Sequence, residues 1–279
     1  MQHIIRYIRQ ELGERYSLSE RTTLARIILE EVSGLTFAGI ATGKISNLSD
    51  SQARELEQIL SRLKKGEPFQ YVLGKTCFYG MEFRVGPSVL IPRPETEELV
   101  EWIIAGNGCE PCTVLDIGTG SGCIAVTLAV KMTQARVDAW ELSAGALQLA
   151  EENARRNHAA VRFSQRDILQ RFACETQYDL IVSNPPYITE AEKGSMEPTV
   201  AAFEPGEALF VPDRDPLLFY RRIAELANGL LKEGGRLYFE IHRSRGEIVC
   251  RMLREKGFGE VELRKDLSGN DRMVRAVKK

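Results

Sequence analysis

The stretch Asp116-Ile117-Gly118-Thr119-Gly120-Ser121-Gly122 stands between a short apolar segment and a segment with helical spacing. Glycines at such a strand-to-helix turn let the backbone bend tightly and approach a ligand closely. The stretch therefore predicts a turn that holds a nucleoside-type cofactor. Dinucleotide-binding folds use similar turns to place a pyrophosphate at a helix N-terminus, so the stretch alone does not say which cofactor is bound.

The segments beyond Cys112 alternate between strand-like and helix-like patterns. Strands are expected at residues 114–117, 137–142, 161–165, 178–183 and 236–241, and helices at residues 124–132, 144–157, 216–231 and 247–256. Alternation of this kind predicts an α/β fold, a parallel Rossmann-like sheet with helices on both faces. Two final strand candidates, residues 261–263 and 273–277, are joined by a short turn and fit an antiparallel edge on that sheet.

Residues 1–68 differ in character from the rest of the chain. Their apolar residues recur at helical spacing, and both Ser17-Leu18-Ser19-Glu20 and residues 49–52 have the register of a capping box. A small helical N-terminal domain is expected there. Aromatic and β-branched residues punctuated by glycines at residues 69–92 predict a connecting β-hairpin, which leaves residues 93–279 for the cofactor-binding domain. Pro92-Arg93-Pro94 bars a helix until Glu95.

The composition indicates a globular protein with a substantial core. The chain has 279 residues, of which 43% are hydrophobic and 27% charged. A net charge of -2 gives no global basic surface, so no stable nucleic-acid partner is expected. No apolar run is long enough for a membrane helix, and the first residues lack the pattern of a signal peptide. We therefore expect no membrane partner and a cytoplasmic location.

The cysteines do not predict a metal site. Of the six, only Cys109 and Cys112 have a CxxC spacing. A zinc site would need two more ligands, yet the other cysteines are scattered and the histidines are isolated. We expect no metal, and a loop that carries two small apolar side chains.

Acidic residues close three of the expected strands. Asp116 would repel a pyrophosphate, but it could hold the cationic amino-acid end of S-adenosylmethionine directly or through water. Glu141 ends the second strand, where a carboxylate can accept hydrogen bonds from both ribose hydroxyls, a role that dehydrogenases share. Asp167 ends the third and could meet the adenine amino group, although a helix cap or a solvated turn is an equal alternative. Charge therefore favours the sulfonium cofactor.

The motif Asn184-Pro185-Pro186-Tyr187 follows an apolar strand directly. Prolines fix the backbone and remove amide donors, so the carbonyls of this loop stay free to face a substrate. A planar amide has a delocalised lone pair, and two acceptors, the Asn184 side-chain oxygen and the Pro185 carbonyl, could hold its NH2 with the nitrogen aimed at a methyl carbon. Tyr187 would stack across the flat group and exclude water. A locally capped, proline-rich turn is the alternative.

With these motifs, the chain resembles the HemK/PrmC family, the glutamine N5-methyltransferases of release factors. The resemblance covers nearly the whole length. It includes Gln70-Tyr71-Val72-Leu73-Gly74, residues 89–100 with Pro92-Arg93-Pro94-Glu95, DIGTGSG, NPPYI and Phe203-Glu204-Pro205. It implies a class I methyltransferase fold, a helical N-terminal domain that docks the release factor, and transfer to the glutamine of a Gly-Gly-Gln loop. S-adenosyl-L-homocysteine would be the product of the cofactor.

The resemblance and the residues together give a set of site positions. Cofactor contacts are expected from Asp116, Gly118, Thr119, Gly120, Ser121, Gly122, Glu141, Asp167, Ile168 and Asn184. Catalysis is expected from Asn184, Pro185 and Tyr187, and substrate binding from Asn184, Pro185, Pro186, Tyr187, Arg93 and Glu95. For Arg93 and Glu95, a salt-bridged corner between domains is an equal alternative. Glu141 stands where many family members have aspartate, and Ile168 where some place an aromatic residue.

Three other functions compete with this one. An adenine N6-methyltransferase also acts on a planar amine, but it must extrude a base and usually needs a basic surface or a recognition domain. A cofactor-binding regulatory protein without turnover would be expected to carry a degenerate Asn184 loop. An NAD-dependent oxidoreductase would need a hydride-handling group that the sequence does not indicate.

Overall fold

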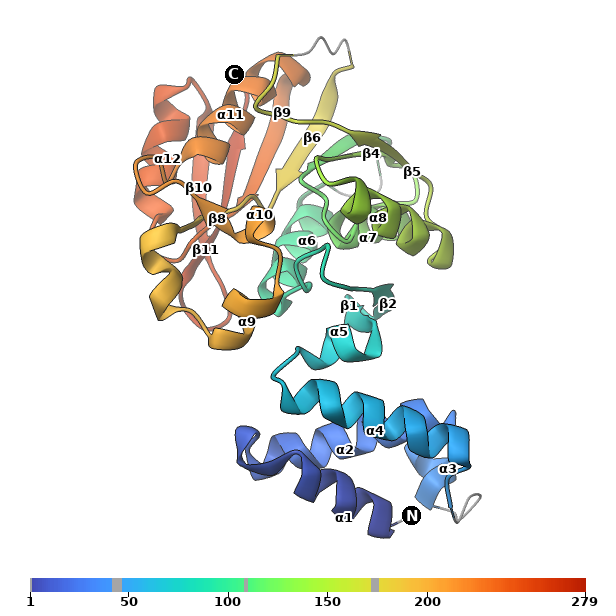
Figure 1. Ribbon diagram of the computed structural model, residues 1–279. Coiled ribbons are helices and arrows are strands. Elements are labelled where there is room, and N and C mark those ends of the chain that lie inside the picture. Colours follow the sequence, from blue (N-terminus) through green and yellow to red (C-terminus); the bar gives the residue numbers. More distant parts are fainter. Residues whose placement is uncertain (1, 42–46, 108–109, 172–175) are drawn as a thin grey trace. The chain divides into compact units, whose positions relative to one another are not determined.

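A computed structural model of the protein describes residues 2–41, 47–107, 110–171 and 176–279. The chain divides into an N-terminal unit, Met1–Gly74, and a C-terminal unit, Lys75–Lys279 (Figure 1). Within the described ranges, no helix combines the length and the apolarity that a membrane crossing requires.

The N-terminal unit is helical, as the sequence predicts. Its elements are α1 (Gln2–Glu11), η1 (Gly13–Arg15), α2 (Leu18–Ser33), α3 (Phe37–Ala41), α4 (Asp50–Lys64) and α5 (Phe69–Leu73). Both expected capping boxes are present, because Ser17 and Glu20 bond each other's backbone N–H groups, and so do Ser49 and Gln52. The apolar stripes of α1, α2 and α4 meet in one buried cluster.

The expected hairpin is shorter than residues 69–92. Phe69–Leu73 forms the helix α5, which ends at Gly74 with φ of 69°, and the hairpin comprises β1 (Lys75–Phe78) and β2 (Met81–Arg84). It packs within the C-terminal unit against the helix Ala144–Arg156: the fully buried Asn153 accepts from the backbone N–H of Arg84 at 2.7 Å and donates to its carbonyl at 3.0 Å. The prediction of strand from residue 69 was wrong because apolar aromatic runs do not by themselves separate a short buried helix from a strand.

The C-terminal unit contains a seven-stranded sheet in the order β10-β11-β9-β6-β3-β4-β5. The strands are β3 (Thr113–Ile117), β4 (Arg136–Glu141), β5 (Val161–Gln165), β6 (Tyr178–Ser183), β9 (Leu231–Glu240), β10 (Gly259–Lys265) and β11 (Asp271–Val277). β11 is antiparallel to both β9 and β10 and lies between them. The reversed strand is therefore inserted inside the sheet, and β10 forms the edge. β9 also begins earlier than expected: the Gly234 N–H donates to the Lys278 carbonyl at 3.0 Å, and the Gly235 carbonyl accepts from the Lys278 N–H at 2.8 Å.

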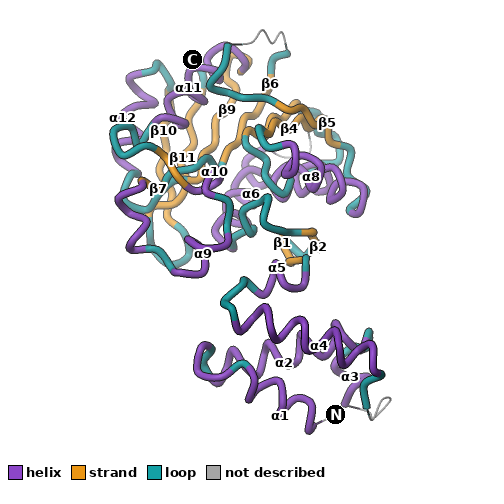
Figure 2. The backbone as a smooth tube through the Cα atoms, viewed as in Figure 1, coloured by secondary structure: helices purple, strands orange, loops and turns teal. Residues whose placement is uncertain are grey.

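Helices cover both faces of this sheet (Figure 2). Alternate strand residues point to opposite faces, so that Leu115 and Ile117 join one buried cluster while Val114 joins the other. The first cluster is closed by α11 (Leu218–Leu230) and α12 (Gly246–Glu255), and the second by α6 (Pro94–Asn107), α7 (Cys123–Lys131) and α8 (Ala144–Arg156). The sequence predicts a helix over residues 96–104, whereas α6 already begins at Pro94, because proline suits the first position of a helix.

A capping segment between β6 and α11 was not foreseen. It consists of β7 (Ile188–Thr189), η2 (Glu190–Ser195), α9 (Pro198–Phe203), α10 (Gly206–Leu209) and β8 (Phe210–Val211). β7 and β8 pair in parallel as a separate two-stranded sheet. These elements are too short to give a periodic signal in the sequence, and their arrangement depends on contacts with distant residues.

Candidate functional site

A cavity of about 550 Å³ lies in the C-terminal unit, where β3, β4, β5 and β6 end. Most of the expected site residues line it, namely Arg93, Gly118, Thr119, Gly120, Ser121, Glu141, Asp167, Ile168, Asn184, Pro185 and Pro186. The carboxyl ends of parallel strands are where open α/β sheets bind ligands. The glycine-rich turn and the Asn184 loop therefore face one and the same cavity.

The glycines of the turn have two different functions in the structure. Gly118 and Gly120 adopt φ of 74° and 55°, and a Cβ on either would meet no atom within 4 Å. Since both line the cavity, the missing side chains leave room for a ligand beside the backbone. Gly122 instead permits close packing, because a Cβ there would lie 3.1 Å from the Cβ of Ala150 on α8.

Glu141 is fixed by backbone N–H groups at the end of β4. Its Oε2 accepts from Gly120 at 2.9 Å, and its Oε1 accepts from Leu142 at 2.8 Å and from Ser143 at 3.0 Å. A carboxylate has about four acceptor positions, so capacity remains for a ligand hydroxyl. Glu141 thus supports the glycine turn from within the wall of the cavity, and its contact with a ribose stays a prediction.

Asp116 lies behind the turn rather than in the wall of the cavity. It is fully buried, its Oδ2 accepts from the Thr119 hydroxyl at 2.6 Å, and its Oδ1 has no hydrogen-bond partner among the described residues. Burial raises the pKa of Asp116 to about 7, although the Thr119 hydrogen bond opposes the shift. Any influence of Asp116 on a cationic ligand would act through Thr119 or through water.

Asp167 forms the local cap that the sequence offered as one alternative, and its contact with adenine stays a prediction. Its Oδ1 caps the turn by accepting from the backbone N–H of Leu169 at 2.9 Å, while the residue also lines the cavity. Oδ2 has no partner in the described part of the chain, so it can still accept a hydrogen bond. The adjoining Ile168, together with Leu142 and Leu169, supplies apolar wall. Leu142 is 52% exposed and Leu169 45% exposed, so both offer apolar surface to a ligand.

The Asn184 loop is held from behind. The Ser183 hydroxyl donates to the Ile117 carbonyl at 2.6 Å, which ties the end of β6 to β3. Arg245 donates to the carbonyl of Tyr187 and, at 2.7 Å, to the carboxylate of Glu192. Arg245 thus binds the carbonyl at the end of the loop, while Asn184, Pro185 and Pro186 line the cavity.

Tyr187 and Glu95 are not among the residues that line the cavity, whereas Arg93 is. The Tyr187 ring packs against the core beside α11, with its centroid 5.7 Å from that of His242, and its hydroxyl points to Glu240. Stacking of Tyr187 on a substrate therefore stays a prediction that this arrangement does not test. The guanidinium of Arg93 forms an ion pair with Glu204 of the Phe203-Glu204-Pro205 motif.

Comparisons with known proteins agree with this geometry. Residues 3–74 match the family model described as PrmC N-terminal domain, and residues 99–202 match the one described as Methyltransferase small domain. A release factor glutamine methyltransferase of Bacteroides thetaiotaomicron is 47% identical over 277 residues, 99% of each chain. Another, of Flavobacterium psychrophilum, is 42% identical over 95% of each chain. The chain belongs to the release factor glutamine methyltransferase family.

Solved methyltransferase structures share the fold of this family member. A methyltransferase of Pyrococcus furiosus has a TM-score of 0.54 at 18% identity and covers 83% of this chain and 99% of its own. The catalytic domain of hMettl16 has a TM-score of 0.57 at 16% identity and covers 82% of each chain. At such identities the likeness concerns the class I methyltransferase fold alone.

Parts of the cavity wall of this methyltransferase escaped the sequence reasoning. They are Ser88, Val89, Leu90, Trp140, Arg166, Pro205, Gly206, Glu207, Ala208, Phe219 and Ile223. The first three precede the Pro-Arg-Pro motif, and the family resemblance of residues 89–100 includes Val89 and Leu90 but not Ser88. The contributions of α10 and α11 have no local signal, because they depend on how the capping segment folds back over the sheet.

No metal centre was found in the ranges that the structure covers: no three His, Cys, Asp or Glu side chains there are grouped to hold an ion. Cys109 lies outside the described residues, so the CxxC spacing cannot be placed. Cys112 is partly buried, and burial raises the pKa of its thiol.

Proposed function

We propose that the protein transfers a methyl group from S-adenosylmethionine to the side-chain amide nitrogen of the glutamine in the Gly-Gly-Gln motif of peptide chain release factors. One observation carries the proposal: Asn184 and Pro185 line the same cavity as the glycine turn and Glu141. Family membership favours release factors as the substrate. The cytoplasmic location expected from the sequence stays a prediction.

The cavity suits S-adenosylmethionine by its shape, its free acceptor position and its apolar surface. Gly118 and Gly120 leave a cradle that a Cβ would fill, Glu141 can accept from a ribose hydroxyl, and Leu142 and Leu169 offer exposed apolar surface for adenine. When bound, the cofactor supplies an activated methyl group on a sulfonium centre.

The loop compensates for the weak nucleophilicity of an amide. Asn184 Oδ1 and the Pro185 carbonyl each accept one N–H of the glutamine, which aims the nitrogen at the methyl carbon without a general base. Their dipoles also stabilise the positive charge that develops on the nitrogen. Pro185 is buried and lacks an N–H, so its carbonyl is fixed in place. The surplus proton leaves to water.

The test incubates the purified protein and methyl-labelled S-adenosylmethionine with three acceptors. These are a release factor, the same factor with its Gly-Gly-Gln glutamine replaced, and adenine-containing DNA. We expect label in the wild-type factor alone. Label in DNA but not in the factor would establish an adenine methyltransferase instead.

A substitution in the loop tests the assigned role of Asn184. Asn184→Ala should reduce turnover by about a hundredfold, the scale of losing one preorganised polar group, with little change in cofactor affinity. Asn228→Ala is the control, since Asn228 lies on α11, does not line the cavity, and its side-chain amide donates to the Lys256 carbonyl at 3.0 Å. Turnover of Asn184→Ala close to that of the control would contradict the role.

A further inference from the structure

A buried carboxylate stands directly behind the Asn184 loop. Glu240 is the last residue of β9, and its neighbour Phe239 is the register partner of Ser183 at the end of β6. Glu240 therefore lies beside the position where the Asn184 loop leaves the sheet. It is 2% exposed and has no place in the mechanism given above.

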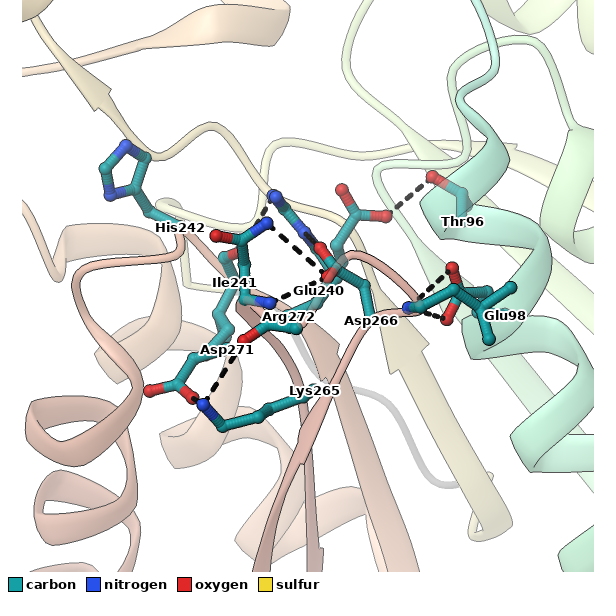
Figure 3. A network of polar contacts seen from close by, with 12 residues as sticks. Thr96, Glu98, Glu240, Ile241, His242, Lys265, Asp266, Asp271 and Arg272 are labelled. Carbon is teal, nitrogen blue, oxygen red and sulfur yellow. Dashed lines mark hydrogen bonds and ion pairs between the residues drawn. The ribbon is translucent and has the colours of Figure 1, made fainter.

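The two oxygens of Glu240 accept from two hydroxyl groups on separate segments. Oε2 accepts from Thr96 at the start of α6 at 2.6 Å, and Figure 3 shows these two side chains pointing toward one another. Oε1 accepts from the Tyr187 hydroxyl in a long hydrogen bond of 3.5 Å. The carboxylate thus joins the Pro-Arg-Pro-Glu-Thr motif to the last residue of the Asn184 loop.

A hydroxyl and a positive charge lie close to the buried carboxylate of Glu240. Burial raises the pKa of Glu240, and the Thr96 hydrogen bond and the positive charge of Arg272 oppose the shift. The guanidinium of Arg272 donates to the Asp266 carboxylate at 3.2 Å (Figure 3). Leu267, which follows Asp266 in the chain, donates its backbone N–H to the carboxylate of Glu98 on α6. The turn between β10 and β11 is thereby fastened to the same helix that carries Thr96.

Stability alone is a weak reason for this arrangement. A buried carboxylate loses its hydration, and apolar residues of similar volume often stabilise a fold as well or better. Tyr187, however, is held at both ends, since Arg245 binds its carbonyl and Glu240 its hydroxyl. A displacement of about 1 Å in reacting groups can reduce a rate by about a hundredfold, so the value of such a clamp lies in placement.

We propose that Glu240 is a positioning residue for methyl transfer, which fixes Tyr187 against Thr96 and so sets where the acceptor oxygens of Asn184 and Pro185 stand. This inference rests on the proposed function. It makes Glu240 and Thr96 matter for turnover although neither needs to touch the glutamine. Tyr187 then serves the loop through its hydroxyl.

The test measures kcat, KM for the release factor, Kd for S-adenosylhomocysteine and the thermal midpoint of each variant. Glu240→Leu removes both acceptors, and we expect kcat to fall by about thirtyfold or more while KM and Kd change by less than about threefold. Glu240→Gln should recover most of kcat, because an amide oxygen accepts one hydroxyl and its NH2 can donate to the other. A glutamine variant as slow as the leucine variant would overturn the proposal.

A double-mutant cycle keeps the test decisive if Glu240→Leu does not fold. Tyr187→Phe keeps the ring and removes the hydroxyl, and it should lower kcat. Thr96→Val removes the other hydroxyl that donates to Glu240, so it should lower kcat on its own and lower it by a smaller factor in the Tyr187→Phe background. Additive effects of the two substitutions, or an unchanged kcat in Tyr187→Phe, would overturn the proposal.

Asp138 and Tyr178 provide a matched control pair. The Tyr178 hydroxyl donates to the buried Asp138 at 2.7 Å, and neither residue lines the cavity. Asp138→Leu and Tyr178→Phe should lower the thermal midpoint and leave kcat unchanged. If the Glu240 variants behave in the same way while the wild-type protein methylates the factor, the inference fails alone. Absence of methylation by the wild-type protein would instead reject the proposed function.

Discussion

Arg93 donates to the carboxylate of Glu204, 111 residues further along the chain, at 2.5 Å. The Glu204 side chain is fully buried, and its second oxygen accepts from the backbone N–H of Ile91 at 3.2 Å. The pair fastens the segment before α6 to the segment between α9 and α10. Both segments line the cavity, so the ion pair helps to define its shape.

Breaking this pair should weaken cofactor binding. Arg93→Met leaves the buried carboxylate with the Ile91 N–H alone, and Glu204→Gln removes the charge that Arg93 neutralises. We expect either substitution to raise the Kd for S-adenosylhomocysteine about tenfold, which corresponds to about 1.4 kcal/mol. Calorimetric titration measures this, and the double variant should lose little more than either single variant. Unchanged affinity in both single variants would mean that the pair does not shape the cavity.

Gly122→Ala should destabilise the protein. Gly122 has φ of 80°, where an L-residue costs about 1–2 kcal/mol, and the new Cβ would approach Ala150 to 3.1 Å. The matched control is Gly229→Ala, because Gly229 is an exposed residue of α11 and a Cβ there meets no atom within 4 Å. The unfolding free energy of the Gly229→Ala variant should rise by up to about 1 kcal/mol. Denaturant titration of both variants checks the prediction. Equal changes in the unfolding free energy of Gly122→Ala and Gly229→Ala would contradict it.

Asp116 should make stability depend on pH. Its pKa rises from 3.8 to about 7 on burial, so the folded protein binds more protons than the unfolded chain between these values. The contribution of Asp116 to the unfolding free energy is therefore complete below about pH 4 and is lost as the pH rises through about 7, by at most about 1.4 kcal/mol per pH unit. Asp116→Asn lacks this component. From pH 4 to pH 7 the unfolding free energy of the wild type should therefore fall relative to that of the variant, and a constant difference would show that Asp116 does not titrate there.

Local patterns in the sequence predicted the sheet and the two loops that face the cavity. The strands β5 and β6 occupy the expected residues, because apolar β-branched runs between turn residues give an unambiguous signal. The glycine turn and the Asn184 loop were placed correctly relative to the strands, since the carboxyl ends of parallel strands share one edge.

Contacts between distant residues could not be predicted in the same way. Nothing in the sequence near Glu240 indicates that it would meet Thr96 across 144 positions of chain. The place of Tyr187 against the core, and the insertion of β11 between β9 and β10, also depend on tertiary packing. The family motif contained Arg93 and Glu204, but only the structure shows that they form an ion pair.

Cofactor affinity should fall when Glu141 loses its charge and change little when its carboxylate is shortened by one carbon. In Glu141→Gln, one of the positions that now accepts a backbone N–H of Gly120, Leu142 or Ser143 becomes an NH2 donor, which opposes those N–H groups. Hydrogen bonds to charged groups contribute about 1.5–3 kcal/mol, so the Kd for S-adenosylhomocysteine should rise by roughly ten- to a hundredfold. Glu141→Asp keeps both acceptor oxygens, so this substitution should change the Kd for S-adenosylhomocysteine by less than about tenfold.

The control for this comparison is Asp179→Asn. Asp179 also accepts from a backbone N–H, that of Thr113 at 2.8 Å, but it lies at the opposite end of β6 from Asn184 and does not line the cavity. Its substitution should leave the Kd unchanged even if stability falls. If Glu141→Gln bound S-adenosylhomocysteine as tightly as this control, the carboxylate would be neither the support of the glycine turn nor the acceptor for the ribose, and the cofactor would have to bind elsewhere in the cavity.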